Sequence, residues 1–325
     1  MILNLVFLIA GLAILLYGAN ILIDSASALA RKFNVPNIVI GLTIIAFGTS
    51  APELAVNIMS AVNGNTELVF GNVIGSNIFN ILGILGVTGI FSALLVNKNT
   101  TWIEIPLVLL AAVTLFIAGS DTIIDGSAES VISNSEGWLL ISFFLIFMGY
   151  NISLVIKNKK EGKTEEDSDI PTKSYKTPIA IMLITVGLAM LIGGGKLIVK
   201  GASEIASLMG MSERVIGLTI VSIGTSLPEL VTSIMAVRKG NVDIAIGNTV
   251  GSNIFNSFLV LGISATITPV AVGSAATVDL LVNLLASLLL FIFIFTGKGR
   301  KLERWESILF ILILVSYMTW LVISQ

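Results

Sequence analysis

Residues 41–86 have the sequence GLTIIAFGTSAPELAVNIMSAVNGNTELVFGNVIGSNIFNILGILG, and residues 217–262 have the sequence GLTIVSIGTSLPELVTSIMAVRKGNVDIAIGNTVGSNIFNSFLVLG. Aligned without gaps, so that position 41 matches position 217 and position 86 matches position 262, the two stretches are identical at 24 of 46 positions. Shared hydrophobicity does not explain a match of this length and regularity, and such internal repeats indicate a duplicated structural unit. We therefore predict that the chain consists of two related halves.

The composition indicates a membrane protein. Of the 325 residues, 55% are hydrophobic and only 12% are charged, and the mean hydropathy is +0.99. A transmembrane helix needs about 20 apolar residues. The apolar runs therefore predict an all-α polytopic membrane protein. Its ten transmembrane helices are expected at residues 2–23, 37–61, 67–93, 102–119, 137–156, 178–198, 213–236, 243–269, 277–296 and 305–323.

Ten spans divided between two copies give five spans per copy. Because five is an odd number, the second copy must enter the membrane in the opposite orientation, and the chain is predicted to form two inverted five-helix repeats. The first repeat covers residues 1–156, with its motif at 41–86, and the second covers 177–325, with its motif at 217–262. The polar stretch 157–176 is predicted to be a cytoplasmic linker.

The basic residues predict the orientation, because cytoplasmic loops of membrane proteins are enriched in Lys and Arg. With the N-terminus outside, fifteen of the 18 Lys and Arg residues lie in cytoplasmic loops, and only Lys196, Lys200 and Arg214 lie outside. Both termini are then expected outside. The first apolar run has no cationic leader, so we interpret it as a span rather than a cleaved signal. These features favour a prokaryotic cytoplasmic membrane.

Several functions are excluded by what the sequence lacks. It has no His and no Cys, and its formal net charge is −2. Thiolate or imidazole catalysis, disulfides and nitrogen or sulfur metal sites are therefore absent. The charge also leaves no basic surface for nucleic acid. We predict no enzyme activity, no cofactor and no obligatory protein partner, and any bound metal must be held by oxygen.

Each half carries the motif Gly-Thr-Ser-x-Pro-Glu inside a predicted span, ending at Glu53 in the first half and at Glu229 in the second. A carboxylate at the bilayer centre costs at least about 2.5 kcal/mol. Pro52 and Pro228 each break the helix before the acid, because proline has no N–H to donate to the carbonyl four residues back. Carbonyls freed at this depth must line a cavity or bind an ion. The motif therefore predicts an ion site.

The predicted ligands are all oxygens, and the two glutamates give the set a charge of −2. Such a site suits a hard cation, and Ca²⁺ accepts six to eight oxygens with tolerant geometry. The next span of each half carries Gly-Asn-x-x-Gly-Ser-Asn-Ile-Phe-Asn, whose Ser and last Asn are four residues apart and so share a helix face. Beside the glutamates, the candidate side chains are Thr49, Ser50, Thr225, Ser226, Ser76, Asn80, Ser252 and Asn256.

Simpler interpretations of these residues also exist. The paired glutamates could be packed as protonated residues, and hydroxyl groups inside a helix often bond to their own backbone. The glycine pairs 71/75 and 247/251 are typical of close helix packing. Four further acids, Asp24, Glu104, Asp243 and Asp279, lie near predicted span ends and are expected at the membrane interface.

The doubled motif resembles the paired alpha-repeats of the calcium/cation antiporter superfamily, and the chain is most similar to its prokaryotic sodium/calcium exchangers. The resemblance implies that Glu53 and Glu229 are central ligands shared by Ca²⁺ and Na⁺, and that the backbone carbonyls of Ala46 and Ser222 contribute. It also implies that spans 2–23 and 178–198 slide across the other eight as a gate. Potassium-dependent members carry Asp where this chain has the neutral Asn256, which argues against K⁺ cotransport.

Together these features predict a secondary active antiporter that exchanges Na⁺ for Ca²⁺ by alternating access, with overlapping ion sites at the membrane midplane. Its partners are expected to be Ca²⁺, Na⁺ and the lipid bilayer. An H⁺/Ca²⁺ exchanger is the nearest alternative. A cation channel could use the same glutamates in a selectivity filter, whereas an intramembrane enzyme would need a nucleophile and base pair that the sequence does not show.

Overall fold

The computed structural model describes residues 2–160, 173–208, 222–273, 276–296 and 299–323. In these residues, eight single helices are long and apolar enough to cross a membrane, and a pair bent by 47° forms one further candidate span. The prediction of an all-α membrane protein is thus confirmed. The predicted linker 157–176 and the predicted span 213–236 lie partly outside the described residues.

In the first half of the chain, several spans are built from consecutive helical pieces, among them the π-helical segments η1, η2 and η3. Their bounds are α1 Ile2–Phe33, α2 Asn37–Ile40, η1 Gly41–Ile45, α3 Ala46–Thr49, α4 Ala51–Val62, α5 Thr66–Ile78, η2 Phe79–Leu85, α6 Gly86–Phe91, η3 Thr100–Glu104, α7 Ile105–Ala118, α8 Asp121–Ile124 and α9 Asn134–Lys160. α9 continues beyond the predicted end of the first repeat at residue 156, so the polar stretch begins within a helix.

The second half repeats this pattern, including a π-helical segment, η6, after the Gly-Ser-Asn motif. Its described helices are α10 Thr177–Leu208, α12 Ser222–Thr225, α13 Leu227–Arg238, α14 Val242–Ile254, η6 Phe255–Val260, α15 Leu261–Ile267, α16 Ala276–Thr296 and α17 Arg304–Ile323. α4 and α5 are joined through Gly64, and α13 and α14 through Gly240, both at a φ of 77°. This left-handed conformation suits glycine because it has no Cβ.

Four short strands join the two halves outside the helices. β1 (Leu94–Leu95) pairs antiparallel with β4 (Lys301–Leu302). β2 (Ser130–Ile132) pairs antiparallel with β3 (Val270–Val272). Each ribbon therefore joins a loop of one half to a loop of the other.

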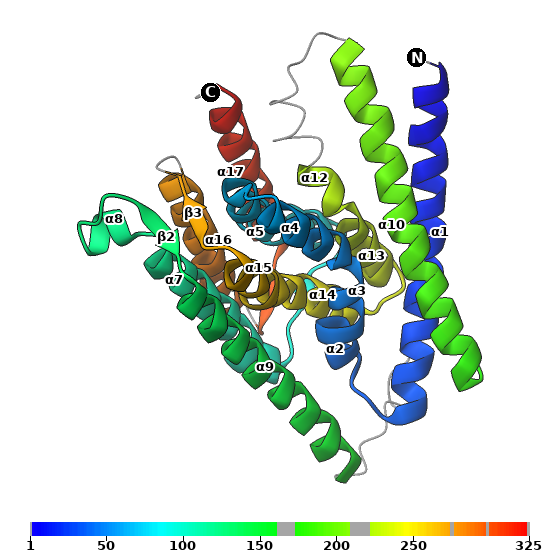
Figure 1. Cartoon of the computed structure of the whole chain (residues 1–325). Helices are drawn as coiled ribbons and strands as arrows, with labels where there is room; N and C mark the ends of the chain where they lie inside the picture. The colour runs from blue at the N-terminus through cyan, green and yellow to red at the C-terminus, as the bar shows by residue number, and fades with distance from the viewer. Residues whose placement is uncertain (1, 161–172, 209–221, 274–275, 297–298, 324–325) are drawn as a thin grey trace.

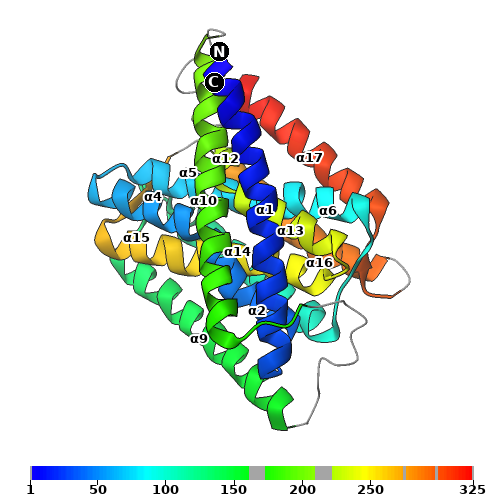
Figure 2. The ribbon, with the colours of Figure 1, turned by 90° about the vertical axis from the view of Figure 1, so that its right-hand side faces the viewer.

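α1 and α10 lie side by side along one side of the molecule (Figure 1) and cross in front of the remaining helices when seen from that side (Figure 2). Their contact depends on glycine. A Cβ added to Gly11 would lie 2.8 Å from the carbonyl oxygen of Gly194, and one added to Gly18 would lie 3.0 Å from that of Gly187. Backbone therefore meets backbone where these helices cross.

The first helix is longer than its predicted span, 2–23. It continues through Asp24 to Phe33, because the Asp24 carboxylate forms ion pairs with Lys239 and, at 2.9 Å, with Lys173. These pairs keep the acid inside the helical segment rather than ending it. The hydrogen bond to Asp24 also raises the pKa of Lys173.

Two other acids expected at the interface are held by tyrosines. Glu104 is fully buried and accepts a hydrogen bond from the Tyr150 hydroxyl at 2.6 Å. Asp279, in the second half, accepts one from Tyr317 at 2.7 Å. Glu104 is thus buried within the protein, where a phenol from α9 replaces water as the donor. Its expected place near the membrane interface stays a prediction.

Candidate cation-binding site

The helix breaks lie where the prolines predict them. α3 ends at Thr49 and α4 begins at Ala51, while Ser50 between them has φ −85° and ψ 5°. In the second half, Ser226 between α12 and α13 has φ −92° and ψ 6°. Each proline thus occupies the first turn of the following helix, where its missing N–H leaves no bond unmade. The breaks place one serine and one glutamate of each half at a helix start.

The two glutamates are bound by serines of the opposite half. The Ser50 hydroxyl donates to Oε1 of Glu229 at 2.9 Å, and the Ser226 hydroxyl donates to Oε1 of Glu53 at 3.4 Å. Both carboxylates are 1% exposed. The two motifs, which lie far apart in sequence, therefore form one buried cluster.

Serines from the Gly-Asn helices complete the same cluster. The Ser50 hydroxyl lies 3.0 Å from that of Ser252, and the Ser226 hydroxyl lies 3.3 Å from that of Ser76. Every one of these contacts has a counterpart in which each partner is replaced by the equivalent residue of the other repeat. The structure thus brings together Glu53, Glu229 and all four serines predicted from sequence.

Two of the predicted asparagines lie one helix turn further along. Asn80 donates to Oδ1 of Asn253 at 3.3 Å, and both Asn80 and Asn256 are 1% exposed. Among the described residues, four side-chain oxygens of the predicted ligands are buried without a hydrogen-bond partner. They are Oε2 of Glu53, Oε2 of Glu229, Oδ1 of Asn80 and Oδ1 of Asn256.

A cation is the chemical species that this donor set fits. A buried acceptor without a partner costs about 1–3 kcal/mol, and more when it is charged. A cation bound among these oxygens removes that cost and compensates the carboxylates. The described part of the chain holds no group of three or more His, Cys, Asp or Glu side chains suited to a metal, so such a cation depends on two carboxylates and neutral oxygens, as Ca²⁺ or Na⁺ can.

The remaining predicted ligands lie on the helical pieces before each break. The Thr49 hydroxyl is within 3.0 Å of the Ile45 carbonyl and 3.3 Å of the Ala46 carbonyl, so it contacts its own helix. The Ala46 carbonyl also accepts the Ser50 N–H at 2.9 Å. Thr225 ends α12, and Ser222 begins it.

Sequence reasoning missed a group of asparagines that position the broken helices. Asn248 donates to the Glu229 carbonyl at 3.2 Å and to the Ser233 hydroxyl at 3.0 Å. Its counterpart Asn72 donates to Oδ1 of Asn57 at 3.3 Å. A signal was present, because both asparagines are mid-span polar residues that are identical in the two halves. They act on the site by holding the helices that carry the glutamates.

The chain matches the sodium/calcium exchanger protein family over residues 3–153 and 179–323. It is 36% identical to the putative antiporter CaxA of Alkalimonas amylolytica over 96% of each chain. It is 31% identical to the sodium/calcium exchanger MaX1 of Methanosarcina acetivorans over 97% of each.

Among solved structures, it is similar to the sodium-calcium exchanger NCX_Mj, with a TM-score of 0.82 and 30% identity over 98% of both chains. The likeness therefore covers both halves of the chain. Fold, site chemistry and sequence agree, and the chain belongs to the sodium/calcium exchanger protein family, within the calcium/cation antiporter superfamily.

Proposed function

We propose that this protein exchanges Na⁺ for Ca²⁺ across the membrane by alternating access. The observation that carries the proposal is the set of four unpaired buried oxygens on Glu53, Glu229, Asn80 and Asn256. Two come from each half of the chain. The backbone carbonyls of Ala46 and Ser222, with nearby hydroxyls, supply the further oxygens that Ca²⁺ coordination needs.

Antiport follows from competition for the two carboxylates. One Ca²⁺ or several Na⁺ ions neutralise the pair, and a loaded site can then move between outward-open and inward-open states. An empty site would leave two carboxylates uncompensated in a medium of low dielectric constant, which is costly. Movement without an ion is therefore suppressed, and the fluxes of the two ions are coupled.

We further propose that the ten spans form two inverted five-helix repeats. The support is reciprocal contact. The pairs Ser50–Glu229 and Ser226–Glu53 exchange roles between the halves. The strand pairs exchange roles in the same way. β1, after the third predicted span, pairs with β4, before the tenth. β3, after the eighth predicted span, pairs with β2, before the fifth. An axis in the membrane plane produces this exchange and places the site near the midplane.

The proposed orientation has both termini outside. Its support is the clustering of basic residues at one end of the bundle, where Lys239 and Lys173 meet Asp24 on α1. Arg31 and Lys32 follow in the last turn of the same helix. The positive-inside rule assigns this end to the cytoplasm.

Sodium is the proposed coupling ion. NCX_Mj and MaX1, to which the chain is similar, are both sodium/calcium exchangers, and Na⁺, like Ca²⁺, is a hard cation that binds oxygen ligands. The neutral amide of Asn256 leaves the balancing charge on the two glutamates, which fits an exchanger without K⁺ cotransport. We propose transport without an enzymatic reaction, because the family consists of ion exchangers.

Uptake of ⁴⁵Ca²⁺ into proteoliposomes loaded with Na⁺, with K⁺ or with a proton gradient tests substrate, coupling ion and mechanism together. We expect uptake that depends on internal Na⁺. Uptake driven by protons instead would show that H⁺, not Na⁺, is the coupling ion, and would leave the proposed Ca²⁺ site unchanged. Uptake without any counter-ion would identify a channel, because an exchanger stalls when the opposite side holds no exchangeable ion.

A further inference from the structure

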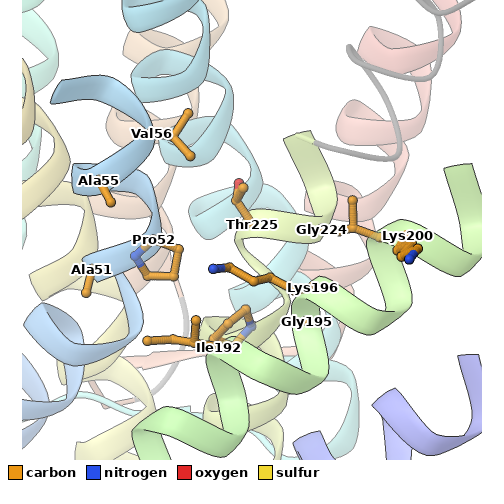
Figure 3. A pocket seen from close by; sticks show the side chains of 12 residues that line it. Ala51, Pro52, Ala55, Val56, Ile192, Gly195, Lys196, Lys200, Gly224 and Thr225 are labelled. Atoms are coloured by element: carbon orange, nitrogen blue, oxygen red, sulfur yellow. The ribbon is translucent and has the colours of Figure 1, made fainter. Parts of the chain in front are cut away.

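A cavity of about 400 Å³ lies between α10 and the broken helices. Its wall includes Pro52, Pro228 and Thr225 (Figure 3). Each proline immediately precedes a glutamate of the site, and the glutamates themselves are 1% exposed. The cavity therefore ends at the prolines, directly against the ion cluster.

Two lysines of α10 line this cavity, and one of them projects across it. Lys196, on α10, extends across the space toward Pro52, as Figure 3 shows. Lys200, one turn later, points away (Figure 3) and lies over the Phe7 ring with its Nζ 5.1 Å from the ring centroid. Apart from these lysines and the Thr225 hydroxyl, the lining side chains are apolar.

Lys196 forms no salt bridge with any residue that the structure describes. Within the described residues, the salt bridges involve Lys173, Lys239 and Lys301 but not Lys196. In the alignment of the two repeats, the equivalent position of the first half is the neutral Asn20. The Asn20 carbonyl accepts a hydrogen bond from Lys239 at 3.0 Å, but that ammonium is paired with Asp24. Among the described residues, the two halves therefore differ at this place, because Lys196 has no such acidic partner.

We propose that Lys196 is a specificity-determining residue that filters entering cations by their charge. The inference rests on the proposed exchange function. It adds the residue that sets the relative affinities for Ca²⁺ and Na⁺ when these ions enter from one side of the membrane. In the proposed orientation this face is the outer one, since α10 runs outward from the cytoplasmic linker. An ion moving through the cavity toward the glutamates must pass the ammonium group, which repels Ca²⁺ twice as strongly as Na⁺.

Coulomb's law makes the signature specific. The interaction energy is proportional to the charge of the ion, so a fixed positive charge that weakens binding of a monovalent ion by a given factor weakens binding of a divalent ion by the square of that factor. For an illustrative separation of about 8 Å and an effective dielectric constant of about 60, the factor is about threefold for Na⁺ and about tenfold for Ca²⁺. If Lys196 acted only as a steric obstacle, the factor for Ca²⁺ would not be the square of the factor for Na⁺.

The experiment uses right-side-out membrane vesicles loaded with Na⁺ and measures the external ⁴⁵Ca²⁺ and, separately, external ²²Na⁺ concentrations that give half-maximal uptake. Three variants are compared with the wild type: Lys196→Met, which removes the charge, Lys196→Arg, which keeps it, and Lys200→Met as the matched control. Ionic strength is then raised with choline chloride, which screens exposed charges.

We expect Lys196→Met to lower the half-maximal concentration about threefold for Na⁺ and about tenfold for Ca²⁺. Lys196→Arg should resemble the wild type. Lys200→Met should change both half-maximal concentrations by less than half as much as Lys196→Met does. Added salt should narrow the difference between Lys196→Met and the wild type. Equal factors for both ions, or Arg and Met variants that behave alike, would overturn the charge filter. Uptake of Ca²⁺ by wild-type vesicles independently of Na⁺ would instead overturn the proposed exchange. The half-maximal Ca²⁺ concentrations of the variants would still decide the role of Lys196.

Discussion

Cross-pairing between the halves is the main feature of the site at the scale of single residues. Glu53 and Glu229 each accept a hydrogen bond from a serine of the other half, and each keeps one oxygen without a partner in the described structure. A carboxylate that serves only packing would have its oxygens satisfied. The unpaired oxygens are therefore the basis, at this scale, of the proposed cation site.

Removing either charge tests this directly. Glu53→Gln and Glu229→Gln should each weaken Ca²⁺ transport at least about 30-fold, because loss of one partner of a buried charged pair costs about 2–5 kcal/mol. Uptake of ⁴⁵Ca²⁺ into Na⁺-loaded proteoliposomes measures the effect. Glu67→Gln is the matched control, since it makes the same change at an exposed position and should transport normally. Retained Ca²⁺ transport in either site variant would rule out a shared site.

Helix breaks and a glycine crossing dominate at the scale of elements. The bend of 47° between α3 and α4 turns a span into two pieces, and Asn72 and Asn248 hold the following pieces by side-chain hydrogen bonds. α1 and α10 instead have a close contact in which glycine Cα atoms face carbonyl oxygens. This arrangement suits a pair of helices that moves as one body along the rest.

Engineered disulfides can separate these roles, because the chain has no cysteine of its own. One pair links α10 to α1: a Cβ on Gly187 would lie 3.0 Å from Cβ of Leu22. The other pair links α3 to α10: a Cβ on Gly48 would lie 3.1 Å from Cγ of Leu188. The Cβ atoms of a disulfide lie about 3.5–4.5 Å apart, so the first pair needs a small outward shift, and the second pair brings its two side chains into contact. Oxidation of Leu22→Cys with Gly187→Cys should preserve exchange.

Oxidation of Gly48→Cys with Leu188→Cys should abolish exchange, and a reductant should restore it. The same ⁴⁵Ca²⁺ uptake assay, before and after reduction, measures both pairs. Exchange that persists with the second pair fully oxidised would show that α10 does not move against α3 during transport.

Ions and the folded protein are linked at the scale of the whole molecule. The site joins the two halves, so an ion bound there stabilises their association as well as the local oxygens. A ligand that binds only the native state contributes about 2.7 kcal/mol at a concentration one hundred times its dissociation constant. Thermal unfolding of the whole molecule therefore reports occupancy of the site.

We expect Ca²⁺ to raise the midpoint of thermal unfolding of the purified protein in detergent, and Na⁺ to raise it at higher concentration. Mg²⁺ should do so less, because it demands a strict octahedron and gives up its water reluctantly. In Glu229→Gln the shift with Ca²⁺ should be largely lost. An equal shift in that variant and the wild type would mean that the stabilising ion binds elsewhere.

Much of the molecule could be predicted because its signals are local. The proline of each Gly-Thr-Ser-x-Pro-Glu motif breaks its helix through the chemistry of its own backbone, and the break is observed at Ser50 and Ser226. The sequence predicts that the first span ends before Asp24, because it shows a charge but not the partner of that charge. It predicts Lys196 only as an outer basic residue, because nothing local places it in a cavity.

By itself, the amino-acid sequence determined the membrane environment, the duplication, the broken helices and the oxygen chemistry of the site, since hydropathy, repeat identity and proline act over neighbouring residues. Tertiary structure alone decided that Ser50 binds Glu229 and Ser226 binds Glu53, and that four oxygens remain unpaired in the described residues. It also decided that Lys196 extends across the cavity, while Lys200, which lines it too, lies over the Phe7 ring. The reason is physical: contacts between residues of different repeats depend on how the halves pack, and packing depends on every helix at once.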